Sequence, residues 1–136
     1  MNRLFPLAFI FLLGFSSQAG CQNFIGLGKD DIAGVLKTVN PHFRLDRNAV
    51  NRSYNYVKFV DKVSEQTILF FLSDSDICTY VRWMADYANL TDMTAMLNSK
   101  YVRNGPNSWS YADKGDHYTV TLTEEEWYFT VSFRKN

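Results

Sequence analysis

The chain holds few residues of the types that perform catalysis or bind metals. His42 and His117 lie far apart in the sequence, and neither has a second ligand at helical spacing, so we expect no metal site and no cofactor. The run Glu124–Glu126 is the densest charge cluster, but at an expected turn it favours solvated carboxylates over acid–base catalysis. A small hydrolase would have to combine His117 with Asp116 or Glu126. We therefore expect that the protein is not an enzyme.

The first twenty residues are typical of a secretory signal. Arg3 supplies a positive charge, residues 4–15 form an unbroken apolar run, and residues 16–20 are small or polar. A membrane-spanning helix needs about 20 apolar residues, so this run is too short to remain in a bilayer as an anchor. We expect residues 1–20 to be a signal peptide that is removed.

Cys21 lies where a lipid could be attached. The stretch Ala19-Gly20-Cys21 resembles the lipobox of bacterial lipoproteins, and the resemblance is confined to this signal region. It implies that Cys21 is acylated, with palmitate-like chains, and becomes the first residue of a small bacterial lipoprotein. Such chains anchor a protein without a transmembrane helix. Gln22 follows Cys21. In enterobacterial lipoproteins, a residue other than Asp at this position implies sorting to the outer membrane. The resemblance therefore implies an outer-membrane lipoprotein of the cell envelope, on its periplasmic or surface face.

Two alternatives to the lipid anchor stay open. Ser17 and Ala19 also satisfy the small-residue rule for ordinary signal cleavage after Ala19, which would release a soluble secreted protein. In that case Cys21 and Cys78 are candidates for a disulfide. Acylation of Cys21 would instead leave Cys78 as a small buried hydrophobe, the usual behaviour of a free cysteine in a core.

Composition limits the partners of the mature chain. The full chain has 14 basic and 14 acidic residues, and removing Arg3 with the signal leaves a net charge of −1. This balance offers no electrostatic attraction to nucleic acid. The membrane is therefore the expected partner through the lipid, together with a protein or glycan. We expect residues 21–28 to form a lipidated tether and residues 29–136 a single domain, and no internal repeat is visible.

Periodicity predicts both helices and strands. Ile32, Val35, Leu36 and Val39 share one face of a helix over residues 30–39. Polar residues 73–76 could cap a second helix over 77–88, in which apolar residues recur at helical spacing, and a third helix is indicated over 92–99. Strands are predicted over residues 54–60, 67–72, 109–112, 118–122 and 127–133.

The order of these elements favours an α+β fold. The order α-β-β-α-(α)-β-β-β groups strands into hairpins, which predicts a two-layer structure with an antiparallel sheet and helices on one face. The order resembles that of profilin-like or roadblock-like folds, with TATA-binding-protein-like folds as an alternative. Because residues 67–72 include five successive apolar side chains, we expect that strand to be internal to the sheet.

Aromatic side chains supply the candidate binding surface. Tyrosine combines a large contact area with a polar group, which suits recognition of proteins or sugars. We expect an open sheet face to carry the candidate binding residues Tyr54, Tyr56, Lys58, Tyr128, Thr130 and Arg134. The sequence thus predicts a membrane-anchored, non-enzymatic binding or assembly module. The alternative is a carbohydrate-binding accessory lipoprotein, which requires at least two coplanar exposed rings.

Overall fold

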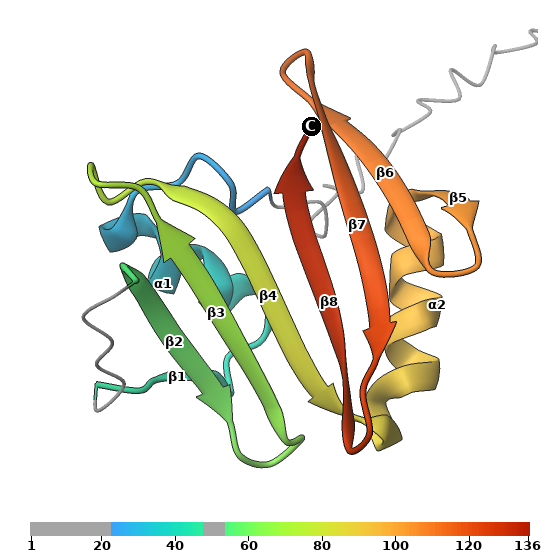
Figure 1. The fold of residues 1–136 in the computed structure, drawn as a ribbon. Coiled ribbons are helices and arrows are strands. Elements are labelled where there is room, and N and C mark those ends of the chain that lie inside the picture. The colour runs from blue at the N-terminus through green and yellow to red at the C-terminus, as the bar shows by residue number, and fades with distance from the viewer. Residues whose placement is uncertain (1–22, 48–53) are drawn as a thin grey trace, which may run out of the picture.

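The computed structural model describes residues 23–47 and 54–136, and these form one antiparallel sheet of eight strands with two α-helices (Figure 1). The helices are α1 (Lys29–Val39) and α2 (Leu90–Lys100), and a 3₁₀ turn, η1 (Tyr87–Asn89), precedes α2. The strands are β1 (Arg44–Leu45), β2 (Tyr56–Asp61), β3 (Gln66–Leu72), β4 (Cys78–Asp86), β5 (Val102–Gly105), β6 (Ser108–Asp113), β7 (Asp116–Glu124) and β8 (Tyr128–Lys135). Their spatial order is β1-β2-β3-β4-β8-β7-β6-β5.

The predicted combination of helices with an antiparallel sheet is confirmed, and β3 is an internal strand of that sheet, as expected. The predicted signal peptide and the acylated Cys21 lie outside the described residues. No helix in the described ranges is long and apolar enough to cross a membrane.

The architecture repeats although the sequence shows no repeat. A helix followed by a four-stranded meander occurs twice, first as α1 with β1–β4 and then as α2 with β5–β8. The last strands of the two halves, β4 and β8, pair antiparallel at the centre of the sheet, with Trp83 opposite Val131. The two helices therefore occupy equivalent places at either side of a central seam (Figure 1).

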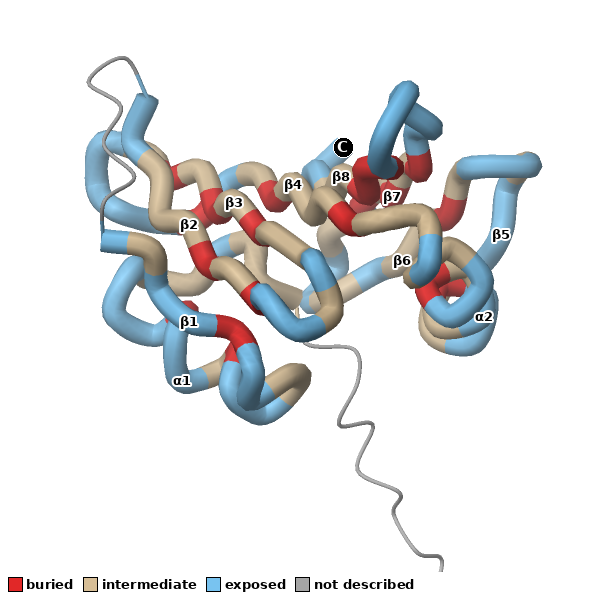
Figure 2. The backbone as a smooth tube through the Cα atoms, turned by 90° about the horizontal axis from the view of Figure 1, so that it is seen from below, coloured by how far each residue is buried: buried red, intermediate tan, exposed pale blue. Residues whose placement is uncertain are grey.

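Two hydrophobic cores lie against one face of the sheet, one beneath each helix. Leu36 of α1 belongs to a core with Ile68, and Leu97 of α2 belongs to a core with Val131. Ile68 pairs with Trp83 and Trp83 pairs with Val131 across the strands, and directly paired residues project to the same side of a sheet. Figure 2 shows α1 and α2 on the same side of the strands.

The helix predicted over residues 77–88 is wrong, because most of this segment, Cys78–Asp86, is the central strand β4. The polar residues expected to cap a helix instead build the β3–β4 turn. The Ser73 hydroxyl accepts hydrogen bonds from the backbone N–H groups of Ser75 and Ile77, and Asp76 adopts a positive φ of 60°. The profilin-like and roadblock-like order depended on that helix, and the observed order differs from it.

The N-terminal segment also differs from the expected tether. Residues 23–28 pack against the domain: the Gly26 N–H donates to the Cys78 carbonyl at 2.8 Å, and the Cys78 N–H donates to the Leu27 carbonyl at 2.8 Å. A further bridge joins Gly28 to Ile77. The boundary expected at residue 29 is therefore too late, since the folded body already includes Asn23.

Candidate functional site

The residues predicted to form a binding face share one side of the sheet but do not converge. Tyr56 and Arg134 lie in one row, because Tyr56 pairs with Phe71, Phe71 with Tyr80, and Tyr80 with Arg134. That row spans three strand spacings, or about 14 Å at roughly 4.8 Å per strand. Two further rings, those of Phe71 and Tyr80, therefore lie between Tyr56 and Arg134 in this row.

The other predicted face residues have different environments. Lys58 forms an ion pair with Asp46 at 3.5 Å, and Tyr54 and Tyr128 are exposed. Thr130, expected on a solvated surface, is 3% exposed, and its hydroxyl has no hydrogen-bond partner in the described ranges. The expected role of Thr130 in an accessible surface is therefore wrong, because neighbouring side chains cover it.

Aromatic rings gather around Phe71 on this open face. The ring of Phe71 lies 5.8 Å from Tyr56, 6.5 Å from Tyr54 and 5.5 Å from Tyr80, with tilted or perpendicular planes. Among the described residues, the rings of Tyr111 and Tyr118 form a parallel stack, with an interplanar angle of 7° and centroids 4.8 Å apart. Tyr118 is buried, so this stack does not supply the exposed coplanar platform that sugar binding requires.

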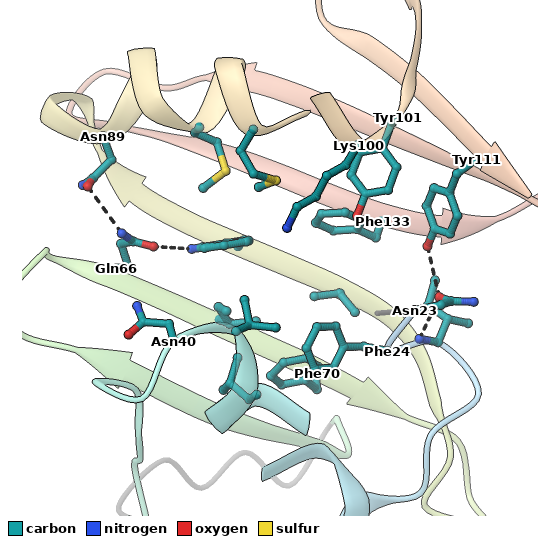
Figure 3. A pocket seen from close by; sticks show the side chains of 18 of the residues that line it. Asn23, Phe24, Asn40, Gln66, Phe70, Asn89, Lys100, Tyr101, Tyr111 and Phe133 are labelled. Carbon is teal, nitrogen blue, oxygen red and sulfur yellow. Dashed lines mark hydrogen bonds between the residues drawn. The ribbon is translucent and has the colours of Figure 1, made fainter. Parts of the chain in front are cut away.

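A deep groove lies on the opposite face, between the two helices (Figure 3). We call it the interhelical groove, and its volume is about 410 Å³. Its floor consists of side chains from the central strands, namely Ile68, Phe70, Val81, Trp83 and Phe133. The floor is apolar because its residues lie on the same face of the sheet as the residues of the two hydrophobic cores.

The walls of the groove come from both helices and from the N-terminal segment. Leu36 and Val39 of α1 form one wall, and Met93 and Met96 of α2 form the other together with the charged Asp92 and Lys100. Phe24 closes the α1 side, with its ring 5.0 Å from the ring of Phe70. Methionine side chains are flexible and adapt to irregular apolar ligands, so the α2 wall can adjust its shape.

A chain of hydrogen bonds borders one end of the groove. The Trp83 indole N–H donates to Gln66 Oε1 at 2.9 Å, and Gln66 Nε2 donates to Asn89 Oδ1 at 3.3 Å (Figure 3). Asn89 Nδ2 in turn donates to the Ser64 carbonyl at 2.8 Å. The network fixes the Trp83 ring in the floor and joins η1, the turn that precedes α2, to the β2–β3 hairpin.

Asn23 borders the other end. Its Oδ1 accepts hydrogen bonds from the Tyr111 hydroxyl at 3.0 Å and from the Ile25 N–H at 3.2 Å, and its Nδ2 donates to Asp113 Oδ2 at 3.1 Å. Burial raises the pKa of Tyr111, with smaller contributions from neighbouring acidic groups. Tyr111 therefore stays protonated and remains a donor to Asn23 at ordinary pH.

Asn40 joins the groove to a buried carboxylate. Asp61, which is 2% exposed, accepts hydrogen bonds from Asn40 Nδ2, from the Ser64 hydroxyl and N–H, and from the Val63 N–H. The hydrogen bond from the Ser64 side chain is the main cause that lowers the pKa of Asp61 to about 2, against the opposing effect of burial. Asp61 is thus ionised at neutral pH and holds Asn40 at the groove.

The candidate chemical residues of the sequence are not gathered at this groove. His117 and Glu126 are exposed, and Asp116 forms an ion pair with Lys135 at 3.3 Å. Cys78 is a free and buried thiol, whose pKa burial raises to about 11. No cluster of three potential metal ligands occurs within residues 23–47 and 54–136.

Sequence reasoning missed the interhelical groove. Its lining combines residues from the N-terminal segment, both helices and the four strands β3, β4, β6 and β8, so it forms only when the two halves of the sheet pair. The available signal was Met93 and Met96 on a short helix, because methionine is favoured at adaptable binding surfaces. That signal is weak, since methionine also fills ordinary cores.

Comparison of the chain with protein-family models, with curated proteins and with solved structures gives no match.

Proposed function

We propose that this protein is a membrane-anchored, non-enzymatic lipoprotein of the cell envelope that binds an apolar, chain-like molecule in the interhelical groove. The observation that carries this proposal is the groove itself. Its volume of about 410 Å³ lies within the range of roughly 300–1,000 Å³ that is typical of small-molecule sites. Binding sites of this kind are mainly apolar, with a few polar groups that orient the ligand.

The arrangement of polar groups indicates the shape of the ligand. Amide side chains occur at the ends of the groove, with Gln66 and Asn89 at one end and Asn23 at the other (Figure 3). The floor between them is lined by aliphatic and aromatic side chains, and the α2 wall beside it also carries the charged Asp92 and Lys100. An extended hydrocarbon chain with one polar end satisfies this pattern, whereas a compact polar molecule would leave its polar groups unpaired over the floor.

The anchor is supported by the signal-like residues 1–20 and by the lipobox-like position of Cys21. The outer membrane is the expected location from Gln22. Mass spectrometry of the membrane-fraction protein, compared with a Cys21→Ser variant, tests the anchor. We expect an acylated N-terminal peptide in the wild type alone. An unmodified Cys21 thiol, or Cys21 bridged to Cys78, would contradict it.

Ligand binding is tested separately with the unlipidated Cys21→Ser chain. Palmitate is the probe, and its binding is followed by calorimetry and by intrinsic tryptophan fluorescence, to which Trp83 in the groove floor contributes. We expect saturable binding with one palmitate per chain, because the groove has room for a single hydrocarbon chain. Absence of saturable binding by a folded Cys21→Ser chain would refute the proposed groove function.

Two substitutions on one helix provide a matched comparison. Val39→Trp places an indole in the wall of the groove, whereas Val35→Trp places it one turn earlier, outside the groove lining. Both valines are half-buried. We expect Val39→Trp to weaken palmitate binding by about tenfold or more, which corresponds to about 1.4 kcal/mol. Val35→Trp should retain affinity, and equal losses in both variants would contradict the location of the site.

A further inference from the structure

The N-terminal segment forms part of the groove to which it leads. Asn23 is held by three hydrogen bonds to Tyr111, Asp113 and Ile25, and the next residue, Phe24, packs on the floor residue Phe70. The first described residue is therefore fixed at one end of the groove instead of moving freely at the end of a linker.

Cys21 precedes this fixed point by only two residues. A polypeptide spans at most about 3.6 Å per residue, so the Cα atom of Cys21 lies within roughly 7 Å of that of Asn23. An acyl chain carried by Cys21 thus starts beside the end of the groove. At this end the floor begins with Phe70, on which Phe24 packs.

We propose that one acyl chain on Cys21 of this protein lies in its own interhelical groove. This inference rests on the proposed function, because it names the occupant of the same site. The groove volume of about 410 Å³ lies near the lower end of the range of roughly 300–1,000 Å³ for small-molecule sites, which suits one acyl chain and not several. One chain fills the groove, and the remaining chains of the lipoprotein stay in the bilayer.

The covalent link favours the protein's own chain over a free lipid. A group joined by a short linker reaches an effective concentration in the millimolar range at a site that it can span. A lipid from the bilayer must leave its membrane to compete, and it gains no such advantage. The groove therefore retracts one of the anchoring chains and holds the body of the protein close to the membrane surface.

Photo-crosslinking in the full, lipidated protein tests this occupancy. A benzoyl-phenylalanine side chain replaces Met96 in the groove wall, and the matched control carries it at Met84, a half-buried methionine on the open face of the sheet. Position 101, where an aromatic side chain already lines the groove, is a second labelling site should the position 96 variant not fold. After irradiation, we expect a covalent adduct between residue 96 and the acylated Cys21 peptide, which is absent at position 84 and in a Cys21→Ser background.

Several results would overturn the inference. An adduct of residue 96 with phospholipid or with another protein would show a foreign occupant, and absence of an adduct at both position 96 and position 101 would show an empty groove. An unacylated Cys21 would also refute it. Palmitate binding by the unlipidated Cys21→Ser chain separates the two proposals, because that binding persists if the groove function is right and only its occupant is wrong.

Discussion

The buried carboxylate of Asp61 provides a quantitative test of the structure. It accepts hydrogen bonds from Asn40, Val63 and Ser64, so it joins the end of α1 to the β2–β3 hairpin. These contacts lower its pKa from 3.8 to about 2. One pKa unit corresponds to about 1.4 kcal/mol, so the ionised form contributes up to about 2 kcal/mol to the free energy of unfolding.

The sign of the pH dependence follows from the direction of the shift. Because the pKa of Asp61 is lower in the folded state, the unfolded chain binds more protons between the two values, and stability falls as the pH falls. The contribution is complete above the unfolded value of 3.8 and is lost as the pH approaches about 2. Asp61→Asn removes the charge at every pH. We expect this variant to be up to about 2 kcal/mol less stable at neutral pH and nearly equal to wild type near pH 2.

Urea unfolding from about pH 7 down to about pH 3, followed by circular dichroism, measures this difference. Asp74→Asn is the control, because Asp74 is an exposed acid in the β3–β4 turn; we expect it to change stability by less than about 0.5 kcal/mol. A stability difference between wild type and Asp61→Asn that stays constant as the pH falls would refute the assigned role of the Asp61 charge.

Three further predictions concern the rest of the domain. Cys78 is 1% exposed, and burial raises its pKa to about 11. In a Cys21→Ser chain, a thiol reagent near pH 8 should therefore label Cys78 only after denaturation. Rapid labelling of the folded chain would contradict its burial. Asn98 Oδ1 accepts a hydrogen bond from the indole N–H of the fully buried Trp109 at 2.9 Å. Asn98→Ala should therefore lower the free energy of unfolding in urea by about 1 kcal/mol. An unchanged unfolding midpoint would show that this hydrogen bond does not contribute. Gly115 has a φ of +83° in the β6–β7 turn, a conformation that is unfavourable for a residue with a Cβ atom. Gly115→Ala should therefore lower the free energy of unfolding by about 1 kcal/mol. A raised melting temperature would contradict the turn geometry.

The strands with a strict alternation were predictable from the sequence. In β7, Tyr118, Val120 and Leu122 are buried and the residues between them are more exposed. The same alternation located β2 and β8, and the continuous apolar run located β3 as an internal strand. Local patterning was sufficient in these segments because each strand has one face with a clear preference for the core.

Strand β4 was not predictable by the same reasoning. It is the central strand, and Tyr80 and Met84 on one face alternate with Val81 and Ala85 on the other. Because both faces are largely apolar, the alternation disappears and apolar residues also fall at helical spacing. The preceding Ser73 and aspartates could start a helix or form a turn, since both use side-chain oxygens to accept backbone N–H groups.

The interhelical groove could not be predicted because it depends on pairing between distant segments. Its floor requires the register of β4 with β8, and one of its ends requires the contact of Asn23 with Tyr111. Glycine-containing residues 23–28 have the composition of a linker, and only their hydrogen bonds with the start of β4 show that they are part of the fold. Sequence patterns report local periodicity, whereas this site arises from tertiary packing.

Methionine methyl groups allow the most direct measurement of the central claim, that the interhelical groove binds a hydrocarbon chain. The chain without its signal contains Met84, Met93 and Met96; the last two line the groove, and Met84 lies on the opposite face of the sheet. Titration of the unlipidated, methionine-labelled Cys21→Ser chain with palmitate should shift the methyl resonances of Met93 and Met96 and leave that of Met84 in place. Shifts of Met84 alone, or of none of the three methyl groups at saturating palmitate, would contradict the assignment of the groove as the binding site.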